Sequence, residues 1–321
     1  MWVFLFLTFI FCLHSEQEEL HLRNIRQVTF PSMGFEKAGE SYFSPDGQSI
    51  IFQAVPKGET SYQIYTMDLS SNIPIRVSTG KGKCTCGFYR PDGAKILFAS
   101  SHEGPPTDLE KPTDRYSWEL TPYMNIYEAN LDGSSLKPIT SGLAYHAECG
   151  YSPDGQQIVY ASNESGSMNL YICNADGTNP HPITRTPHCY NGGPFFSPKG
   201  DWIVFRADRQ EKDILQLYLI RPDGSDERQL TSDPHVNWAP FWHPNNRLIA
   251  YTTSRHGHHA YQIYLLDIET NREYRLTYSH TFEGLPSFSA DGTQITWTSK
   301  RGDNTPQVFI ADFKCSDWCR P

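Results

Sequence analysis

Residues able to bind metals or transfer protons precede six copies of one short phrase, which first occurs as Ser-Pro-Asp-Gly at residues 44–47. The proline of each copy, replaced by alanine in the last, serves as an anchor, and the anchors are Pro45, Pro91, Pro153, Pro198, Pro244 and Ala290. Seven residues before the anchors lie Ala38, Cys84, His146, Asn191, Asn237 and Glu283. Five residues before them lie Glu40, Cys86, Glu148, Gly193, Ala239 and Leu285. Slightly farther upstream lie His188, His235 and His280.

Residues two apart on a regular strand point to the same side, so a strand that alternates here would bring both sets together. We therefore predict a mixed polar mouth on one face of the molecule. Its predicted ligand-binding residues are Glu40, His146, Glu148, His188, Asn191, His235, Asn237, His280 and Glu283.

Two functions fit such a mouth. Its polar side chains can bind a protein or glycan ligand, or simply fill a wet channel and satisfy backbone groups at the strand ends. The histidines at 146, 188, 235 and 280 can instead hold a divalent metal, which would act as Lewis acid in a carbohydrate lyase or lactonase. We expect binding rather than catalysis, and the sequence assigns no catalytic residue, metal ligand or cofactor. The nucleophile elbow Gly-x-Ser-x-Gly of a hydrolase does not occur, so peptidase activity is not expected.

The elements that would position these residues recur with the phrase. Successive anchors are 46, 62, 45, 46 and 46 residues apart. An isoleucine stands five residues after every anchor, and an aromatic residue stands seven after it. Because the two share one face of a strand and follow a Pro-Asp-Gly turn, each phrase predicts a β-hairpin.

Two further strands follow each hairpin. The third contains pairs such as Ile64-Tyr65 and Leu217-Tyr218, and the shorter fourth ends in a hydroxyl residue, as in Val77-Ser78 and Leu276-Thr277. The sixth copy lacks its fourth strand, but residues 24–30, with Val28-Thr29, fit that pattern. We predict an all-β, six-bladed β-propeller with four strands per blade, closed by the N-terminal strand, which removes an exposed sheet edge.

The repeated pattern SPDG, I-x-F, IY and LT resembles the TolB-like, or PD40, branch of WD40-like β-propellers, from about residue 24 to residue 313. The resemblance implies the propeller fold. Propellers of this kind serve as Tol–Pal components and as gating domains of prolyl-oligopeptidase-type peptidases. Since the fold does not determine the function, the sequence favours a rigid binding platform for a protein or glycan ligand at the channel mouth.

The N-terminal segment predicts that the chain is secreted. Residues 2–13 are apolar and suit a signal peptide ending near Ser15, although a buried N-terminal strand is the alternative. We predict a signal peptide at 1–15 and a propeller at 24–321, secreted to the periplasm or the extracellular space. The net charge of −9, without a basic run, argues against nucleic-acid binding. No later segment suits a membrane span, and we expect a monomer.

Three local features remain open. Removal of the signal leaves seven cysteines, an odd number, and the spacing of Cys84, Cys86 and Cys149 does not match the usual Cys-x2-Cys zinc pairs. The long step in the second repeat carries an insertion with Tyr116, Trp118 and Tyr123, which can shield the mouth, contact a partner or pack on the blades. Asn163-Glu-Ser is a glycosylation sequon in a predicted loop.

Overall fold

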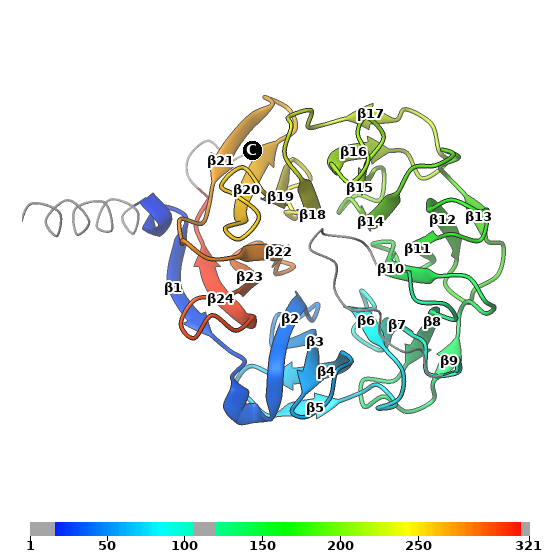
Figure 1. Ribbon diagram of the computed structural model, residues 1–321, viewed down its shortest axis with the longest axis horizontal. Coiled ribbons are helices and arrows are strands. Elements are labelled where there is room, and N and C mark those ends of the chain that lie inside the picture. The colour runs from blue at the N-terminus through cyan, green and yellow to red at the C-terminus, as the bar shows by residue number, and fades with distance from the viewer. Residues whose placement is uncertain (1–16, 106–119, 316–321) are drawn as a thin grey trace, which may run out of the picture.

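The computed structural model describes residues 17–105 and 120–315, which form six four-stranded sheets arranged around a central axis (Figure 1). All strand pairs within the sheets are antiparallel. The predicted all-β, six-bladed propeller with four strands per blade is therefore confirmed.

Each blade runs from an inner strand beside the axis to an outer strand, which is short in the first five blades. The first blade contains β2 (Phe35–Phe43), β3 (Ser49–Pro56), β4 (Gln63–Asp68) and β5 (Pro74–Arg76). The second contains β6 (Cys84–Tyr89), β7 (Ile96–Ser100), β8 (Asn125–Ala129) and β9 (Lys137–Pro138). The third contains β10 (His146–Tyr151), β11 (Gln157–Ser162), β12 (Asn169–Asn174) and β13 (His181–Pro182).

The second half of the ring repeats this arrangement. The fourth blade contains β14 (Asn191–Phe196), β15 (Ile203–Ala207), β16 (Gln216–Ile220) and β17 (Arg228–Gln229). The fifth contains β18 (Asn237–Trp242), β19 (Leu248–Thr253), β20 (Gln262–Asp267) and β21 (Arg272–Arg275). The sixth contains β22 (Glu283–Phe288), β23 (Gln294–Ser299), β24 (Gln307–Phe313) and β1 (Leu22–Gln27). A 3-10 turn, η1 (Pro31–Met33), joins β1 to the first blade.

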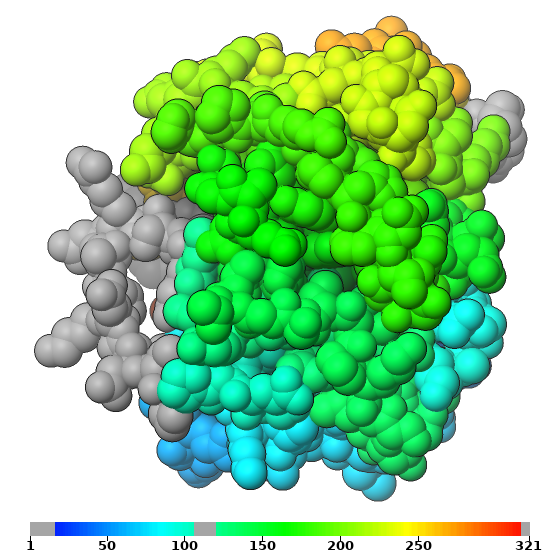
Figure 2. Space-filling model, turned by 90° about the vertical axis from the view of Figure 1, so that its right-hand side faces the viewer, coloured from blue at the N-terminus to red at the C-terminus, as the bar shows by residue number. Residues whose placement is uncertain are grey.

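The repeated isoleucines and aromatics form the core. The isoleucine after each anchor and the aromatic two residues later are buried in all six blades. The phrase before them is a tight turn, in which Gly47 has φ of +71° and donates its N–H to the carbonyl of Ser44 at 2.8 Å. Glycine suits this position because other residues reach positive φ only with strain. Figure 2 shows the outer wall formed by the second, third and fourth blades, whose surfaces lie against one another.

A hydroxyl residue stands two positions after each fourth strand and accepts a hydrogen bond from the third strand of its blade. The donor and acceptor pairs are Ile64 N–H to Ser78, Ile126 to Thr140, Leu170 to Thr184, Leu217 to Thr231, Ile263 to Thr277 and Val308 to Thr29, at 2.8–3.0 Å. Thr29 belongs to the N-terminal segment, and β1 pairs with β24. The predicted closure by the N-terminal strand is thus confirmed down to this side-chain contact.

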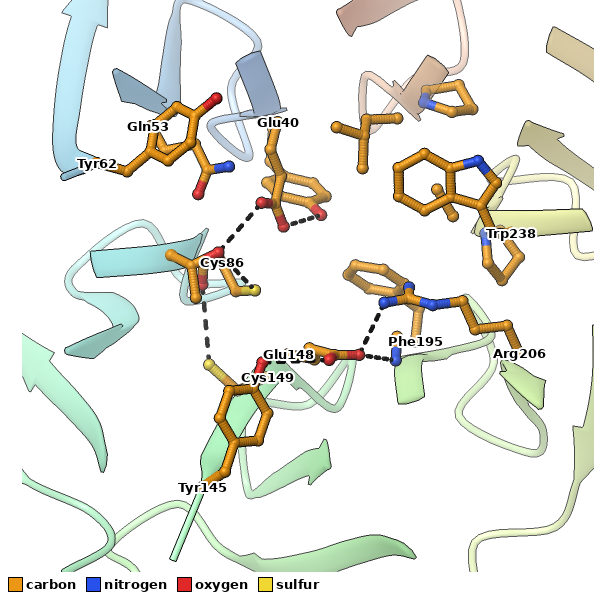
Figure 3. Close-up of a pocket in the computed structure, with 17 residues that line it drawn as sticks. Glu40, Gln53, Tyr62, Cys86, Tyr145, Glu148, Cys149, Phe195, Arg206 and Trp238 are labelled. Atoms are coloured by element: carbon orange, nitrogen blue, oxygen red, sulfur yellow. Dashed lines mark hydrogen bonds and ion pairs between the residues drawn. The ribbon is translucent and has the colours of Figure 1, made fainter. Parts of the chain in front are cut away.

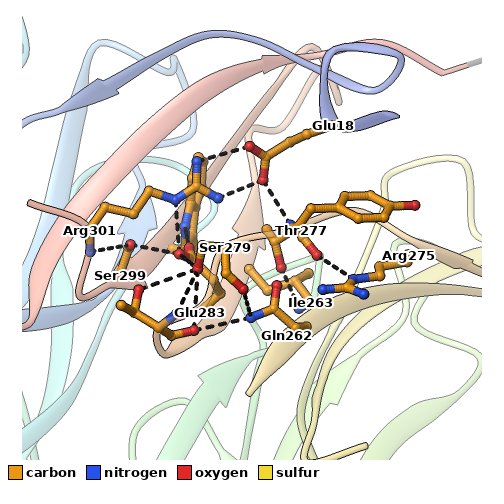
Figure 4. Close-up of polar contacts among 12 residues, drawn as sticks. Glu18, Gln262, Ile263, Arg275, Thr277, Ser279, Glu283, Ser299 and Arg301 are labelled. Atoms are coloured by element: carbon orange, nitrogen blue, oxygen red, sulfur yellow. Dashed lines mark hydrogen bonds and ion pairs between the residues drawn. The ribbon is translucent and has the colours of Figure 1, made fainter. Parts of the chain in front are cut away.

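A second contact ties the N-terminal segment to the ring (Figure 4). The carboxylate of Glu18 pairs with both terminal nitrogens of Arg301 at 2.6 and 3.0 Å and accepts the N–H of Tyr278 at 3.1 Å. Arg301 also donates to Glu283 at 2.8 Å, and Glu283 accepts the indole N–H of Trp297 at 2.6 Å. Since Tyr278 follows the fifth blade and Arg301 lies in the sixth, Glu18 bridges two blades.

Several predictions fall partly on residues that the structure does not describe. The predicted signal peptide lies outside the described residues, as do Tyr116, Trp118 and Cys319. Tyr123 lies within them, close to Gly104, where an added Cβ would meet the Tyr123 side chain at 2.7 Å. Among residues 17–105 and 120–315, no helix is long and apolar enough to span a membrane.

The cysteines within the described residues differ in their bonding state. The buried thiols Cys84, Cys86, Cys149 and Cys173 and the half-buried Cys189 are free, whereas Cys315 is disulfide-bonded. Within the described part of the chain, no three His, Cys, Asp or Glu side chains are grouped so that they could hold a metal ion.

Candidate functional site

Aromatic side chains close the central channel part-way along its length. They stand three residues before the anchors and come from four inner strands: Tyr42, Phe88, Phe195 and Phe241. The ring centroid of Phe195 lies 5.0 Å from that of Phe241 and 5.6 Å from that of Tyr42, and Tyr42 lies 5.2 Å from Phe88. We call this group the aromatic plug. It separates two cavities, since Tyr42 and Phe195 line both.

The two cavities differ in chemistry. The one beside the phrase turns, of about 310 Å³, is lined by anchor prolines and by aromatic residues such as Trp242 and Phe288. The other, of about 390 Å³, contains two carboxylates, a guanidinium, two thiols and several aromatic rings. We call the second one the mouth cavity, because the residues five positions before all six anchors line it. Its charged groups make it the candidate functional site (Figure 3).

A β-bulge in every inner strand aims these residues at the axis. The pairing of each inner strand with the next shifts register at this point. All six residues there have φ between +44° and +57°: Glu40, Cys86, Glu148, Gly193, Ala239 and Leu285. A bulge with one residue in the left-handed region turns that side chain away from the regular alternation. Because of the bulge, the side chains five residues before the anchors do not point to the same side as those seven residues before.

Glu148 is the centre of a buried hydrogen-bond network. Its carboxylate accepts the hydroxyl of Tyr190 at 2.7 and 2.8 Å and Nη2 of Arg206 at 3.0 Å. It also accepts the backbone N–H of Gly193 and the Tyr145 hydroxyl, the latter at 3.3 Å. The side chains of Glu148 and Arg206 are nearly fully buried. A buried carboxylate is stable when donors compensate its lost hydration, and this one has four.

Two adjacent glycines leave the room for this network. A Cβ at Gly192 would lie 2.3 Å from the Tyr190 hydroxyl and 2.4 Å from Glu148 Oε2. A Cβ at Gly193 would lie 2.0 Å from Nη1 of Arg206. Any larger residue at either position would displace part of the network.

Glu40 lies across the cavity in a different environment. Its carboxylate accepts two long hydrogen bonds, from Thr85 Oγ1 at 3.3 Å and from the Tyr42 hydroxyl at 3.4 Å. Burial raises the pKa of Glu40, and the nearby charge of Glu148 adds to the rise, whereas the Cys86 thiol and Arg206 oppose it. Glu40 is thus held less firmly in its charged form than a carboxylate with close donors would be.

The remaining wall groups are neutral. Burial, with a smaller contribution from Glu40, raises the pKa of Tyr62 to about 12, so that its hydroxyl stays protonated. Burial also raises the pKa of the Cys86 and Cys149 thiols. Because the thiolate is the reactive form of cysteine, these two thiols are not activated nucleophiles.

The structure brings together two of the nine predicted mouth residues. Glu40 and Glu148 line the cavity, but His146, Asn191, Asn237 and Glu283 do not, although alternation of the strand predicts that they should. The bulge is the physical reason, since it breaks the alternation between the two sets. Their side chains lie buried within the blades, where Asn191, for example, donates to Thr186 at 2.7 Å.

The histidines do not converge. His146 is buried against Tyr160, and burial lowers its pKa. His188 and His280 are exposed and His235 is half-buried, and none of the four lines the mouth cavity. The arrangement needed by the metal-dependent alternative is therefore not formed by these residues. Whether any of them contacts a ligand stays a prediction.

Four functional candidates lie outside the positions five and seven residues before the anchors. Arg206 and Gln53 belong to second strands, eight residues after their anchors, where the other blades carry Ala or Thr. Trp238 stands six residues before its anchor, where the other blades carry Gly, Ala or Thr. Tyr190 precedes β14 and reaches Glu148. Arg206, Gln53 and Trp238 differ in residue type from the residues at the same repeat position of the other blades. This difference is the sequence signal that would have identified them.

Comparison with known proteins agrees with the fold. Residues 116–260 match the model of the TolB beta propeller domain, PD40. The chain is 24% identical over 254 residues to the Protein TolB homolog of Chlorobium luteolum, which covers 73% of this chain and 46% of that protein. The chain spans about half the length of the first curated relatives it matches.

Solved structures of low sequence identity share the same architecture. The structure of putative TolB from Agrobacterium tumefaciens superposes with a TM-score of 0.63 and 20% identity, over 87% of this chain and 91% of that one. An oligogalacturonate lyase in complex with manganese superposes with a TM-score of 0.54 and 17% identity, over 92% and 94% of the two chains. At these identities the likeness shows the fold alone.

Proposed function

Because the chain is a TolB-like β-propeller, we propose that it acts outside the cytoplasm as a rigid platform that binds a protein or glycan partner at the mouth cavity. One observation carries this proposal: the cavity combines a preformed charged network with aromatic walls above a closed channel. Binding sites are typically concave and apolar, with a few precisely placed polar groups.

The side chains favour binding over catalysis. Glu148 is committed to four donors, and the Cys86 and Cys149 thiols are neutral. Trp238 is largely buried but contributes to the cavity wall, and residues of this type dominate binding energy in many interfaces. The rigid frame also limits the entropy that ordering the site would cost on binding.

The test begins with a search for ligands and ends with paired tryptophan variants. The purified protein is screened against a glycan array and a displayed peptide library, and each ligand is titrated by calorimetry. For a ligand bound at the mouth, Trp238→Ala should weaken affinity by about thirtyfold or more, as expected of a central aromatic contact. Trp202→Ala is the matched control, because Trp202 lies outside the mouth cavity. Equal affinities for the wild type and Trp238→Ala, across all ligands found, would refute the proposal.

A further inference from the structure

The charges that line the mouth cavity do not balance. Its lining residues include two carboxylates, Glu40 and Glu148, and one cation, Arg206. Arg206 pairs with Glu148 at 3.0 Å, and both side chains are nearly fully buried. Among the residues that the structure describes, no Lys, Arg or His side chain forms an ion pair with Glu40. The cavity therefore has one carboxylate without a cationic partner.

Unused acceptor capacity lies beside that carboxylate. The two hydroxyl donors of Glu40 are 3.3 and 3.4 Å away, at the long limit for O–H···O bonds. Gln53 follows on the neighbouring strand, opposite Gly39 in the register of β2 and β3. Its side-chain oxygen is buried and has no hydrogen-bond partner within the described residues. Figure 3 shows Gln53 and Glu40 on the same side of the cavity.

A buried acceptor without a donor costs free energy, so a ligand that supplies donors would gain from both groups. A primary ammonium group offers three N–H donors and a positive charge, and it accepts none. Aromatic faces add attraction, because a cation near a ring interacts with its negative face. The walls of the cavity include the rings of Tyr42, Tyr62 and Trp238. Together these features are complementary to an alkylammonium ion.

We propose that the mouth cavity binds a primary ammonium group of its partner, supplied by a lysine side chain or by the amino terminus of a chain, with Glu40 as the counter-charge and Gln53 as a second acceptor. The inference rests on the proposed function and names the ligand of the same site. The single cation of the cavity is already paired with Glu148, so an anionic ligand would meet the negative charge of Glu40 instead.

The experiment uses four small probes that differ in one group. Nα-acetyl-lysine amide carries the side-chain ammonium, and alanine amide carries the chain-terminal one. Nα,Nε-diacetyl-lysine amide and N-acetyl-alanine amide are their neutral counterparts. Binding to the intact protein is followed by calorimetry and by the fluorescence of the tryptophans. At least one charged probe should bind, its neutral counterpart should bind at least about tenfold more weakly, and the charged probe that binds identifies the source of the ammonium.

Paired variants locate the probe. Glu40→Gln keeps the shape of the side chain and should weaken the charged probe by about tenfold or more, as the loss of a charge-assisted hydrogen bond implies. Glu36→Gln, an exposed position on the same strand β2, should leave affinity unchanged. Gln53→Leu removes the second acceptor and serves as an independent variant should Glu40→Gln fold poorly. Unfolding curves of all three report their integrity.

The outcomes separate this inference from the proposed function. Equal binding of charged and neutral probes, or unchanged affinity in both Glu40→Gln and Gln53→Leu, overturns the ammonium assignment. Tighter binding of Nα-acetyl-arginine amide than of either amine overturns it in favour of a guanidinium. If a partner depends on Trp238 but is not displaced by the amines, the platform stands and the ammonium inference fails. If neither partner nor probe responds to Trp238→Ala, both fail.

Discussion

Replacing Gly192 with alanine should break the network around Glu148 without straining the backbone. Gly192 does not have a positive φ, so alanine is compatible with its backbone conformation. The new methyl group would lie 2.3 Å from the Tyr190 hydroxyl and 2.4 Å from Glu148 Oε2, well inside van der Waals contact. One of these side chains must move, and the bond between them, now 2.7 Å long, is lost.

The magnitude follows from that bond. A hydrogen bond to a charged group contributes about 1.5–3 kcal/mol. Glycine to alanine also removes entropy from the unfolded chain, which stabilises the folded protein by about 0.4–1 kcal/mol. Gly192→Ala should therefore lower the free energy of unfolding by about 0.5–2.6 kcal/mol.

Gly150 supplies a matched control on the inner strand of the preceding blade. A Cβ there meets nothing closer than 3.5 Å, and its φ is not positive either. Because the entropic gain is common to both variants, their difference of about 1.5–3 kcal/mol isolates the lost bond. Urea denaturation followed by tryptophan fluorescence measures both free energies. Equal stability of the Gly192→Ala and Gly150→Ala variants would refute the assignment of this network as a stabilising, sterically fitted unit.

Three further changes test the frame and the cavity. Thr29→Val removes the acceptor of the Val308 N–H and should lower the free energy of unfolding by about 1–3 kcal/mol. Thr184→Val, the equivalent change in the third blade, should lower it by a similar amount. An unchanged free energy of unfolding in Thr29→Val would contradict closure through this contact. Phe195→Ala removes the ring at the centre of the aromatic plug and should lower the free energy of unfolding, measured by denaturant titration, by about 3–5 kcal/mol. A decrease below about 1 kcal/mol would contradict the packing of this ring. Burial raises the pKa of Glu40 above its ordinary value of 4.5, so the folded state binds more protons and the stability of the wild type should fall as pH rises from 4.5 through the folded pKa. Glu40→Gln should reduce that fall without abolishing it, because burial also raises the pKa of Glu283. Parallel stability profiles of variant and wild type would show that Glu40 is not perturbed.

The propeller fold could be predicted because the same residue types pack at the same positions in every blade. The isoleucine and aromatic after each anchor are buried wherever they occur, so their spacing survives in all six copies. The hydroxyl at the end of the fourth strand recurs because it accepts one backbone N–H. Thr29 shares this role although it lies at the other end of the chain, and it was therefore recognisable from its pattern.

The orientation of the mouth residues could not be predicted in the same way. The six bulge positions hold Glu, Cys, Glu, Gly, Ala and Leu, which share no propensity for the left-handed region. A regular strand was therefore the natural expectation, and it joined residues such as Glu283 to the mouth. In the structure Glu283 is buried beside Trp297 and Arg301 instead. The bulge is a property of how the inner strands pair, so no single residue type signals it.

The charge of the mouth cavity follows from the order of the blades in the ring. The bulge aims one residue per blade at the axis, but only the first and third blades place a carboxylate there, Glu40 and Glu148. The single guanidinium, Arg206, comes from the fourth blade, which adjoins the third. Its side chain therefore reaches Glu148, while Glu40 lies two blades away from Glu148 along the ring. The uneven charge of the cavity therefore arises from a cation that occurs once among its lining residues. Adding a second cation at the equivalent second-strand position of the first blade, as Gln53→Arg, should neutralise Glu40 and abolish binding of an ammonium probe.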